Sequence, residues 1–193
     1  MDFKNIMIVS FFTRDKKYMD FAEALKKGLD IFNVNYYLEG VRSTGSYHQN
    51  CLYKTTFIKN CLLNFKCPVL FIDVDSIIVD NPYKHLDNII NTEFDIGVVR
   101  TPTSKHKYTD AIHLWNNTHA TFKVLDKWEE LNKTTGKMDH VNLLNSFSSV
   151  KYSARLVNIN EHIRHWFIGV FSKCDRKIIF RPYGSITPDL FRF

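Results

Sequence analysis

The sequence predicts an α/β protein with a mostly parallel sheet and helices on both faces. Through the first half of the chain, short apolar runs of strand length alternate with segments whose apolar residues recur at helical spacing. Such alternation is typical of a parallel sheet with covering helices. The third apolar run, residues 69–72, leads directly into Asp73-Val74-Asp75. Open sheets of this kind bind ligands at the carboxyl ends of their strands.

The composition indicates one compact domain over residues 1–193. The chain is 45% apolar, which is enough for one well-formed core, and its 7 Gly and 5 Pro exclude a low-complexity or disordered chain. The formal net charge of +6 favours anionic partners. Because the Lys and Arg residues form no dense block, pairs such as Lys16-Lys17 are interpreted as the solvated face of a helix.

The first half of the chain alternates between strand and helix patterns. Apolar and aromatic residues predict strands over residues 6–12 and 31–38, on either side of a helix that begins near residues 13–15. A polar loop over residues 39–50 then leads into a second helix, and residues 69–72 form the third strand. The residues expected on the buried faces of the two helices are Tyr18, Phe21, Ala22, Leu25, Leu29, Cys51, Thr55, Ile58 and Leu62.

The second half is less regular. Its predicted strands are residues 94–99, 111–115, 154–159 and 177–180. Thr118 is the predicted N-cap of a helix, and Asp139 is the predicted N-cap of the helix after it. The residues expected on the apolar faces of these helices are Val124, Leu125, Trp128, Leu131, Val141, Leu144 and Phe147.

Asp73 and Asp75 are the residues from which a function can be argued. Two carboxylates at the end of a buried strand are costly unless a cation compensates them. At positions i and i+2 of an extended chain both side chains point the same way, which would let the pair share one divalent metal. Oxygen ligands suit Mg²⁺ or Mn²⁺. The alternative is that both carboxylates only accept hydrogen bonds from backbone N–H groups where the strand ends.

Several motifs follow one another in a defined order. Lys54-Thr55-Thr56-Phe57-Ile58 precedes Asp73-Val74-Asp75 by one strand. After them come FDIGVV, AIHLWNNT, a helix ending in Trp128, and Asp139-His140 before Leu143. This ordered set, over roughly residues 4–147, resembles the nucleotide-sugar glycosyltransferases of the GT-A fold, whose DxD motif also follows a third strand. The compact size is similar to that of glycosyltransferases encoded by large DNA viruses.

The resemblance implies a GT-A-like, Rossmann-like fold with a mixed, mostly parallel sheet. Residues 1–82 would form the nucleotide-binding half, and residues 83–193 the half that binds the donor sugar and the acceptor. The implied activity is metal-dependent transfer of a hexose or deoxyhexose from a nucleoside diphosphate to a hydroxyl of a glycan or other acceptor. UDP is the first candidate for the nucleoside diphosphate. The implied cofactor is Mn²⁺ or Mg²⁺, and nucleic acid is not expected as a partner.

The resemblance assigns the metal and the diphosphate to residues around the third strand. Asp75 would bind the metal and so help to neutralise the diphosphate leaving group. Asp73 would share that metal or hold the ribose, with Val74 beside the nucleotide. Lys54 would reach the diphosphate, and the alternative is a solvated lysine on a helix surface.

Further residues are assigned to the nucleoside and the sugar. Phe11, Phe12 and Thr13, at the end of the first strand, would bracket a flat base, although an aromatic residue there is core at least as often. The family's Asn-Ser-Gly motif is replaced by Ala111-Ile112-His113. His113 is the candidate for the donor-sugar contact, with a core or surface histidine as the alternative.

Asp139 and Asp110 are the candidates for the catalytic base that an inverting enzyme needs. Asp139 would deprotonate or hold the acceptor hydroxyl, and its alternative is a helix N-cap. Retaining members of the family end with a metal-binding His followed by Gly and Lys. His165, Gly169 and Lys173 follow that order, with one residue too many before Gly169. His165 is therefore a candidate third metal ligand, or else a surface histidine, and Lys173 is a candidate diphosphate ligand.

The same residues leave two other functions as alternatives. Phosphatases of the haloacid dehalogenase family also use a D-x-D motif beside Mg²⁺. Their motif continues into Gly-Thr and usually opens the first strand, whereas Asp75 is followed by Ser76-Ile77 after two strand–helix units. A non-catalytic nucleic-acid-binding module would need a continuous basic patch, and the basic residues here are scattered.

Cysteine usage and the first residues bear on the cellular compartment. Cys51, Cys61, Cys67 and Cys174 contain no CxxC pair and fit no zinc or redox motif. We therefore expect free thiols in a reducing compartment. The N-terminal apolar run is typical of a strand rather than of a secretory signal, and no stretch approaches transmembrane length. These observations predict a cytoplasmic location, which for a viral protein would be the host cytoplasm.

Overall fold

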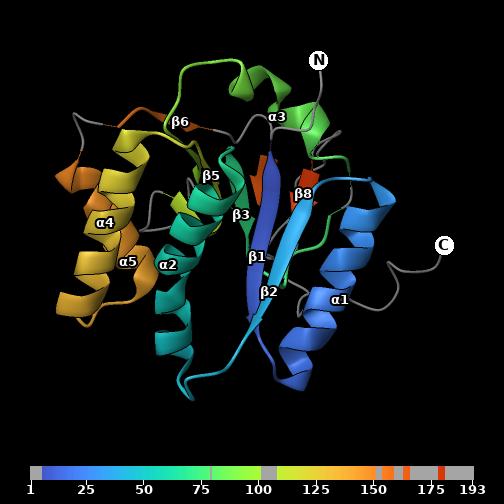
Figure 1. Cartoon of the computed structure of the whole chain (residues 1–193), viewed down its shortest axis with the longest axis horizontal. Coiled ribbons are helices and arrows are strands. Elements are labelled where there is room, and N and C mark those ends of the chain that lie inside the picture. Colours follow the sequence, from blue (N-terminus) through green and yellow to red (C-terminus); the bar gives the residue numbers. More distant parts are fainter. Residues whose placement is uncertain are drawn as a thin grey trace.

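A six-stranded mixed sheet with helices on both faces forms the body of the protein (Figure 1). The computed structural model describes residues 6–78, 80–100, 108–150, 154–158, 163–165 and 178–180. The strands are β1 (Met7–Thr13), β2 (Tyr36–Val41), β3 (Val69–Ile72), β4 (Ile96–Arg100), β5 (Tyr108–Trp115), β6 (Leu156–Asn158), β7 (Ile163–His165) and β8 (Ile178–Phe180). The helices are α1 (Lys16–Ile31), α2 (Tyr47–Phe65), α3 (Tyr83–Ile90), α4 (His119–Thr134) and α5 (Asp139–Ser149).

The strand order of the main sheet is β2-β1-β3-β5-β4-β6, and β7 and β8 pair separately. β1 is parallel to β2 and β3, and β4 is parallel to β6. β5 is antiparallel to both of its neighbours, β3 and β4. The predicted α/β fold with a mixed, mostly parallel sheet is therefore confirmed. Because β5 runs the other way, its amino end lies beside the carboxyl end of β3.

Alternating side chains of the sheet build a core on each face. Ile8 of β1 and Leu70 of β3 pack with Leu25 of α1 on one face. Their sequence neighbours Val9 and Phe71 belong to the core on the other face, together with residues of α2, α4 and α5. Figure 1 shows the same division, with α1 on one side of the sheet and α2, α4 and α5 on the other. This alternation is what a sheet buried on both faces requires.

β1 is longer than β3, and this difference shapes the rim where both strands end. The register between them pairs Val9 with Phe71, and β3 ends one residue later, at Ile72. β1 continues to Thr13, paired with β2 on its other side. The chain leaving β3 therefore passes the last residues of β1, and this brings residues 73–75 next to them.

The predicted strand over residues 31–38 is wrong in its first half. α1 continues through Ile31, which is 76% exposed and so does not belong to a buried strand. Asn33 then adopts a left-handed conformation with φ of +48°, where helices commonly end, and β2 begins only at Tyr36. The apolar residues Ile31 and Phe32 at the end of α1 have the same sequence pattern as the start of a strand.

One helix was not predicted at all. α3 follows the turn residues before Tyr83, whose hydroxyl donates to the Ile6 carbonyl at 3.0 Å and accepts from the Asn35 N–H at 2.7 Å. These two bonds fix α3 against the amino ends of β1 and β2. The short strand β7 was also not predicted. None of the helices that the structure describes combines the length and apolar character that spanning a bilayer would need.

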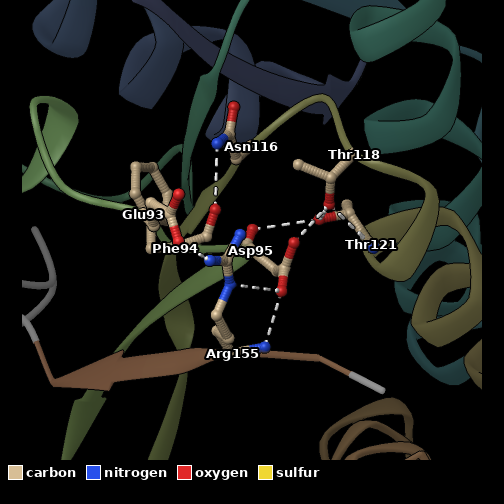
Figure 2. A network of polar contacts seen from close by, with 7 residues as sticks. All are labelled: Glu93, Phe94, Asp95, Asn116, Thr118, Thr121 and Arg155. Carbon is tan, nitrogen blue, oxygen red and sulfur yellow. Dashed lines mark hydrogen bonds and ion pairs between the residues drawn. The ribbon is translucent and has the colours of Figure 1, made fainter.

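A buried carboxylate, that of Asp95, joins three segments at the end of the sheet opposite residues 73–75 (Figure 2). Its oxygens accept hydrogen bonds from the Thr118 hydroxyl and from the Arg155 backbone N–H, each at 2.6 Å. The Asp95 carbonyl accepts a third bond, from the Thr121 hydroxyl at 3.0 Å. Thr118 is the N-cap of α4, as predicted. Asp95 thus holds the starts of β4, α4 and β6 together.

Replacing Asp95 with Ala should lower the free energy of unfolding by about 2–4 kcal/mol, because several buried donors would lose their acceptor. Urea unfolding of the purified chain measures this loss. Glu93→Ala is the matched control, since Glu93 pairs with the Arg155 side chain at the surface and should cost less than about 1 kcal/mol. Equal losses in the two variants would contradict a structural role for the Asp95 carboxylate.

Candidate functional site

A cavity of about 300 Å³ opens where β1 and β3 end. The end of β1, the start of α1, the loop and first turns of α2, and the turn after β3 line it. The lining residues are Phe11, Phe12, Thr13, Asp15, Tyr18, Ser43, Gly45, Tyr47, Asn50, Cys51, Lys54, Asp73, Val74 and Asp75. Phe11, Phe12, Thr13, Lys54 and Val74, which the resemblance assigned to the nucleotide, line this one cavity, as do Asp73 and Asp75, two of the three residues assigned to the metal.

Asp73 and Asp75 lie in a turn rather than in an extended strand. The Asp73 N–H donates to the Ala111 carbonyl at 2.8 Å, and the Ser76 N–H donates to the Asp73 carbonyl at 3.1 Å. The expectation that both carboxylates align along an extended chain is therefore wrong in its geometry. The turn nevertheless keeps both of them at the cavity, while Val74 between them is 6% exposed and packs into the core.

Lys54 is a buried cation between two carboxylates. Its ammonium lies 3.1 Å from Asp73 Oδ1 and 3.5 Å from Asp139 Oδ2. It also lies 5.0 Å from the centre of the Phe71 ring, within the range of a cation–π contact. The lysine side chain is 5% exposed, which excludes a solvated helix lysine. Asp73, whose side chain is 34% exposed, therefore has a protein cation beside it, and the buried Asp139 shares that cation.

Asp139 is not the N-cap that the sequence predicted. Met138 occupies the N-cap position of α5 without a side-chain hydrogen bond, and Asp139 is the first helical residue. The Asp139 carboxylate is 2% exposed and pairs with Lys54. Its backbone carbonyl accepts a hydrogen bond from the Trp128 indole at 2.8 Å. The need to compensate a buried ammonium outweighs the smaller gain from capping a helix.

The charged groups of the cavity favour a cation. Among the described residues that line it, Asp15, Asp73 and Asp75 carry carboxylates and Lys54 carries an ammonium. An anionic ligand would therefore meet an excess of negative charge. Within the part of the chain that the structure describes, no group of three or more His, Cys, Asp or Glu side chains could hold a metal. Two carboxylates still fit Mg²⁺ or Mn²⁺ if water and phosphate oxygens fill the other positions.

Asp15 and Tyr18 add polar groups on the α1 side of the cavity. Asp15 is the N-cap of α1 and accepts bonds from the Thr13 hydroxyl and the Tyr18 N–H. The bond from Thr13 is the main cause that lowers the pKa of Asp15. Burial, and then the charge of Asp75, raises the pKa of Tyr18. At neutral pH the cavity thus presents an ionised carboxylate and a protonated phenol on this side.

Phe11 and Phe12 combine the two roles that the sequence left open. Phe11 lies with the core under α2, 5.4 Å from the Phe57 ring centre and 5.3 Å from that of Tyr53. Phe12 packs on the opposite core, under α1. Both side chains are half-buried and both line the cavity. They are core residues whose remaining surface forms an apolar wall.

Tyr47 and Cys51 were not assigned to the site, although they share one face of α2 with Lys54. The spacing i, i+4, i+7 from Tyr47 to Lys54 was the available signal. Burial raises the pKa of the Cys51 thiol to about 11, and the Asp139 carboxylate adds to this shift. The nearby thiol in turn raises the pKa of Tyr47. Both groups are therefore protonated at neutral pH.

The remaining predicted residues do not lie at the cavity or cannot be located there. His113 is fully buried in β5, stacked 6.0 Å from Phe71 and packed against Trp128, so the core alternative replaces the predicted sugar contact. Asp110 lies in β5 and His165 in β7, but their side chains are outside the described residues. Lys173 is outside them altogether.

Replacing Lys54 with Met should lower the free energy of unfolding by about 3–5 kcal/mol, because Asp139 would stay buried without its cation. Urea unfolding measures the loss. Lys59→Met on the same helix is the matched control, since its ion pairs with α4 lie nearer the surface and should cost less than about 1 kcal/mol. Adding Asp139→Asn to Lys54→Met should recover part of the loss. A Lys54 variant as stable as the Lys59 variant would disprove the buried pair.

The Cys51 thiol should react slowly with iodoacetamide at pH 8, because its raised pKa leaves little thiolate. The rate should climb as the pH approaches about 11. Asp139→Asn should accelerate the reaction at Cys51 by removing a negative charge. Cys67, whose pKa is raised mainly by burial, is the internal control and should not respond to that variant. Peptide mass spectrometry separates the two thiols, and equal acceleration at both would refute the link from Asp139 to Cys51.

Comparison with known proteins bears on the fold. No protein-family model and no curated protein matches the sequence. A glycosyltransferase involved in the glycosylation of the major capsid of PBCV-1 is similar in structure, with a TM-score of 0.66 at 11% identity over 83% of this chain and 84% of that one. The apo form of the glycosyltransferase GlyE of Streptococcus pneumoniae TIGR4 has a TM-score of 0.51 at 13% identity over 79% of this chain. This chain covers 45% of GlyE. The chain therefore has the fold of these glycosyltransferases, and the GT-A-like architecture implied by its motifs is confirmed.

Proposed function

We propose that the protein is a metal-dependent glycosyltransferase. It transfers a hexose or deoxyhexose from a nucleoside diphosphate, with UDP as the first candidate, to a hydroxyl of a glycan or other acceptor. The observation that carries the proposal is the pair Asp73 and Asp75 in an acidic cavity at the carboxyl ends of β1 and β3. Ligands of open α/β sheets bind at this rim. A fold shared with glycosyltransferases supports the same reaction class.

Asp73 and Asp75 are the residues that would hold Mn²⁺ or Mg²⁺. When bound, such an ion would supply positive charge to the diphosphate leaving group. The charge balance of the cavity supports this dependence. Among the described residues that line the cavity, three carboxylates and one ammonium support a diphosphate that carries a divalent cation.

Lys54 fixes Asp73 and adds a positive charge to the cavity wall. Its ammonium is 3.1 Å from Asp73 Oδ1, and the side chain lines the cavity although it is 5% exposed. An ammonium held between two carboxylates keeps one position. Charge held in place before the reaction stabilises a departing anion at little reorganisation cost.

The nucleoside would lie against the end of β1. Phe11 and Phe12 offer an apolar wall, which suits the flat face of a base. Tyr18, whose raised pKa keeps its hydroxyl protonated, offers a hydrogen-bond donor on the α1 side. The Thr13 hydroxyl donates a hydrogen bond to the Asp15 carboxylate, so Thr13 would affect the nucleoside site by orienting that carboxylate.

Asp139 would act through Lys54 rather than on the acceptor. A general base must come within hydrogen-bond reach of the proton that it accepts. Asp139 is 2% exposed, pairs with Lys54 and is not part of the cavity lining. Its position supports a positioning role. Asp110 stays the candidate base for an inverting reaction, since β5 begins beside the rim where β3 ends.

A screen of nucleotide sugars with Mn²⁺ and mixed acceptors tests the proposal. The wild-type chain should release a nucleoside diphosphate from one donor class, and EDTA should abolish that release. Asp75→Ala should reduce the rate by about 10²–10³ through loss of charge stabilisation, with an unchanged circular dichroism spectrum.

Asp80→Asn is the matched control, because Asp80 lies in the same segment and its Oδ1 accepts a bond from the Asn81 N–H, which an amide oxygen can also accept. This variant should keep wild-type turnover. Full activity of Asp75→Ala, or turnover in EDTA, would exclude the metal role. Hydrolysis of phosphomonoesters without sugar transfer would favour the phosphatase alternative.

A further inference from the structure

Trp128 reaches from α4 to the first residue of α5. Its indole N–H donates to the Asp139 carbonyl at 2.8 Å, and both residues are buried. A carbonyl oxygen has two lone pairs, so this bond adds to the helical bond that the oxygen can accept. The indole thus fixes the backbone of the residue whose carboxylate pairs with Lys54.

The indole itself is held by aromatic packing. Trp128 stacks on Trp115 with ring centres 6.1 Å apart and planes 15° apart. His113 packs edge-on against it at 6.2 Å. The three side chains are all fully buried, which leaves the donor little freedom to move. A rigid donor can set the position of a helix start.

The start of α5 has no side-chain cap of its own. Met138 makes no capping bond, and the Asp139 carboxylate is turned toward Lys54. Its Oδ2 lies 3.5 Å from the ammonium, which is an ion pair rather than a short hydrogen bond. The distance between the Asp139 carboxylate and the Lys54 ammonium therefore depends on where the backbone of Asp139 lies. The Trp128 bond supplies that placement.

We propose that Trp128 is a positioning residue for the cavity, acting through Asp139 and Lys54 on Asp73. The contacts form one chain: indole to Asp139 carbonyl at 2.8 Å, Asp139 carboxylate to Lys54 at 3.5 Å, and Lys54 to Asp73 at 3.1 Å. The consequence for catalysis rests on the proposed function. The placement of Asp139 by Trp128 does not, so the two can be tested apart.

Trp128→Phe removes the indole N–H and keeps an aromatic ring. Trp115→Phe is the matched control, because Trp115 is equally buried, stacks on Trp128 and has no hydrogen-bond partner for its Nε1 among the described residues. With a donor found by the nucleotide-sugar screen, Trp128→Phe should lower kcat/KM at least about tenfold relative to Trp115→Phe, since small misplacements in a site are costly. Equal kinetic losses in the two variants would overturn the catalytic consequence.

A second measurement needs no activity. Urea unfolding of Trp128→Phe and Trp115→Phe is compared in the wild-type and Asp139→Asn backgrounds, which forms a double-mutant cycle. The shift in midpoint caused by Trp128→Phe should shrink in the Asp139→Asn background, because no carboxylate then remains to be held against Lys54. The shift caused by Trp115→Phe should be the same in both backgrounds. Additive shifts for Trp128→Phe would overturn the positioning role, whether or not the protein transfers sugar.

Discussion

The structure around the cavity depends on one buried ammonium, that of Lys54. It lies between Asp73, in the turn after β3, and Asp139, at the start of α5. Three elements, α2, the turn after β3 and the start of α5, therefore meet at a single charge. Removing Lys54 would leave the buried Asp139 carboxylate without its cation, so the ammonium ties α2 to the start of α5, and the partly exposed Asp73 pairs with the same ammonium. The geometry of the cavity is a consequence of this pairing.

The same charges define what the cavity can bind. Lys54 compensates Asp73 and Asp139, and Asp15 and Asp75 add two more carboxylates to the described lining of the site. Under the proposed function, these carboxylates would bind a divalent cation, and the cation would in turn hold a diphosphate. The apolar wall of Phe11 and Phe12 beside these carboxylates suits a nucleoside attached to that diphosphate. The charges and the apolar wall of the cavity thus fit the proposed class of substrate.

The sequence allowed the sheet and its rim to be predicted because their signals are local. The apolar run before Asp73 and the turn residues after it do not depend on distant contacts. Local signals failed where tertiary contacts decide. Asp139 is a residue type that often caps helices, yet its carboxylate pairs with Lys54 of another helix. His113 occupies a motif position that suggests a sugar contact, but β5 is buried on both faces, and the side chain stacks on Phe71 instead.

Thermal unfolding with UDP and Mn²⁺, separately and together, tests the central claim most directly. If Asp73 and Asp75 bind a nucleoside diphosphate only with its cation, the two ligands together should raise Tm by several degrees, and neither alone should do so. At a hundredfold excess over Kd, linkage predicts about 2.7 kcal/mol of stabilisation. Equal stabilisation by UDP in EDTA, or none with both ligands and with other nucleoside diphosphates in place of UDP, would contradict the account.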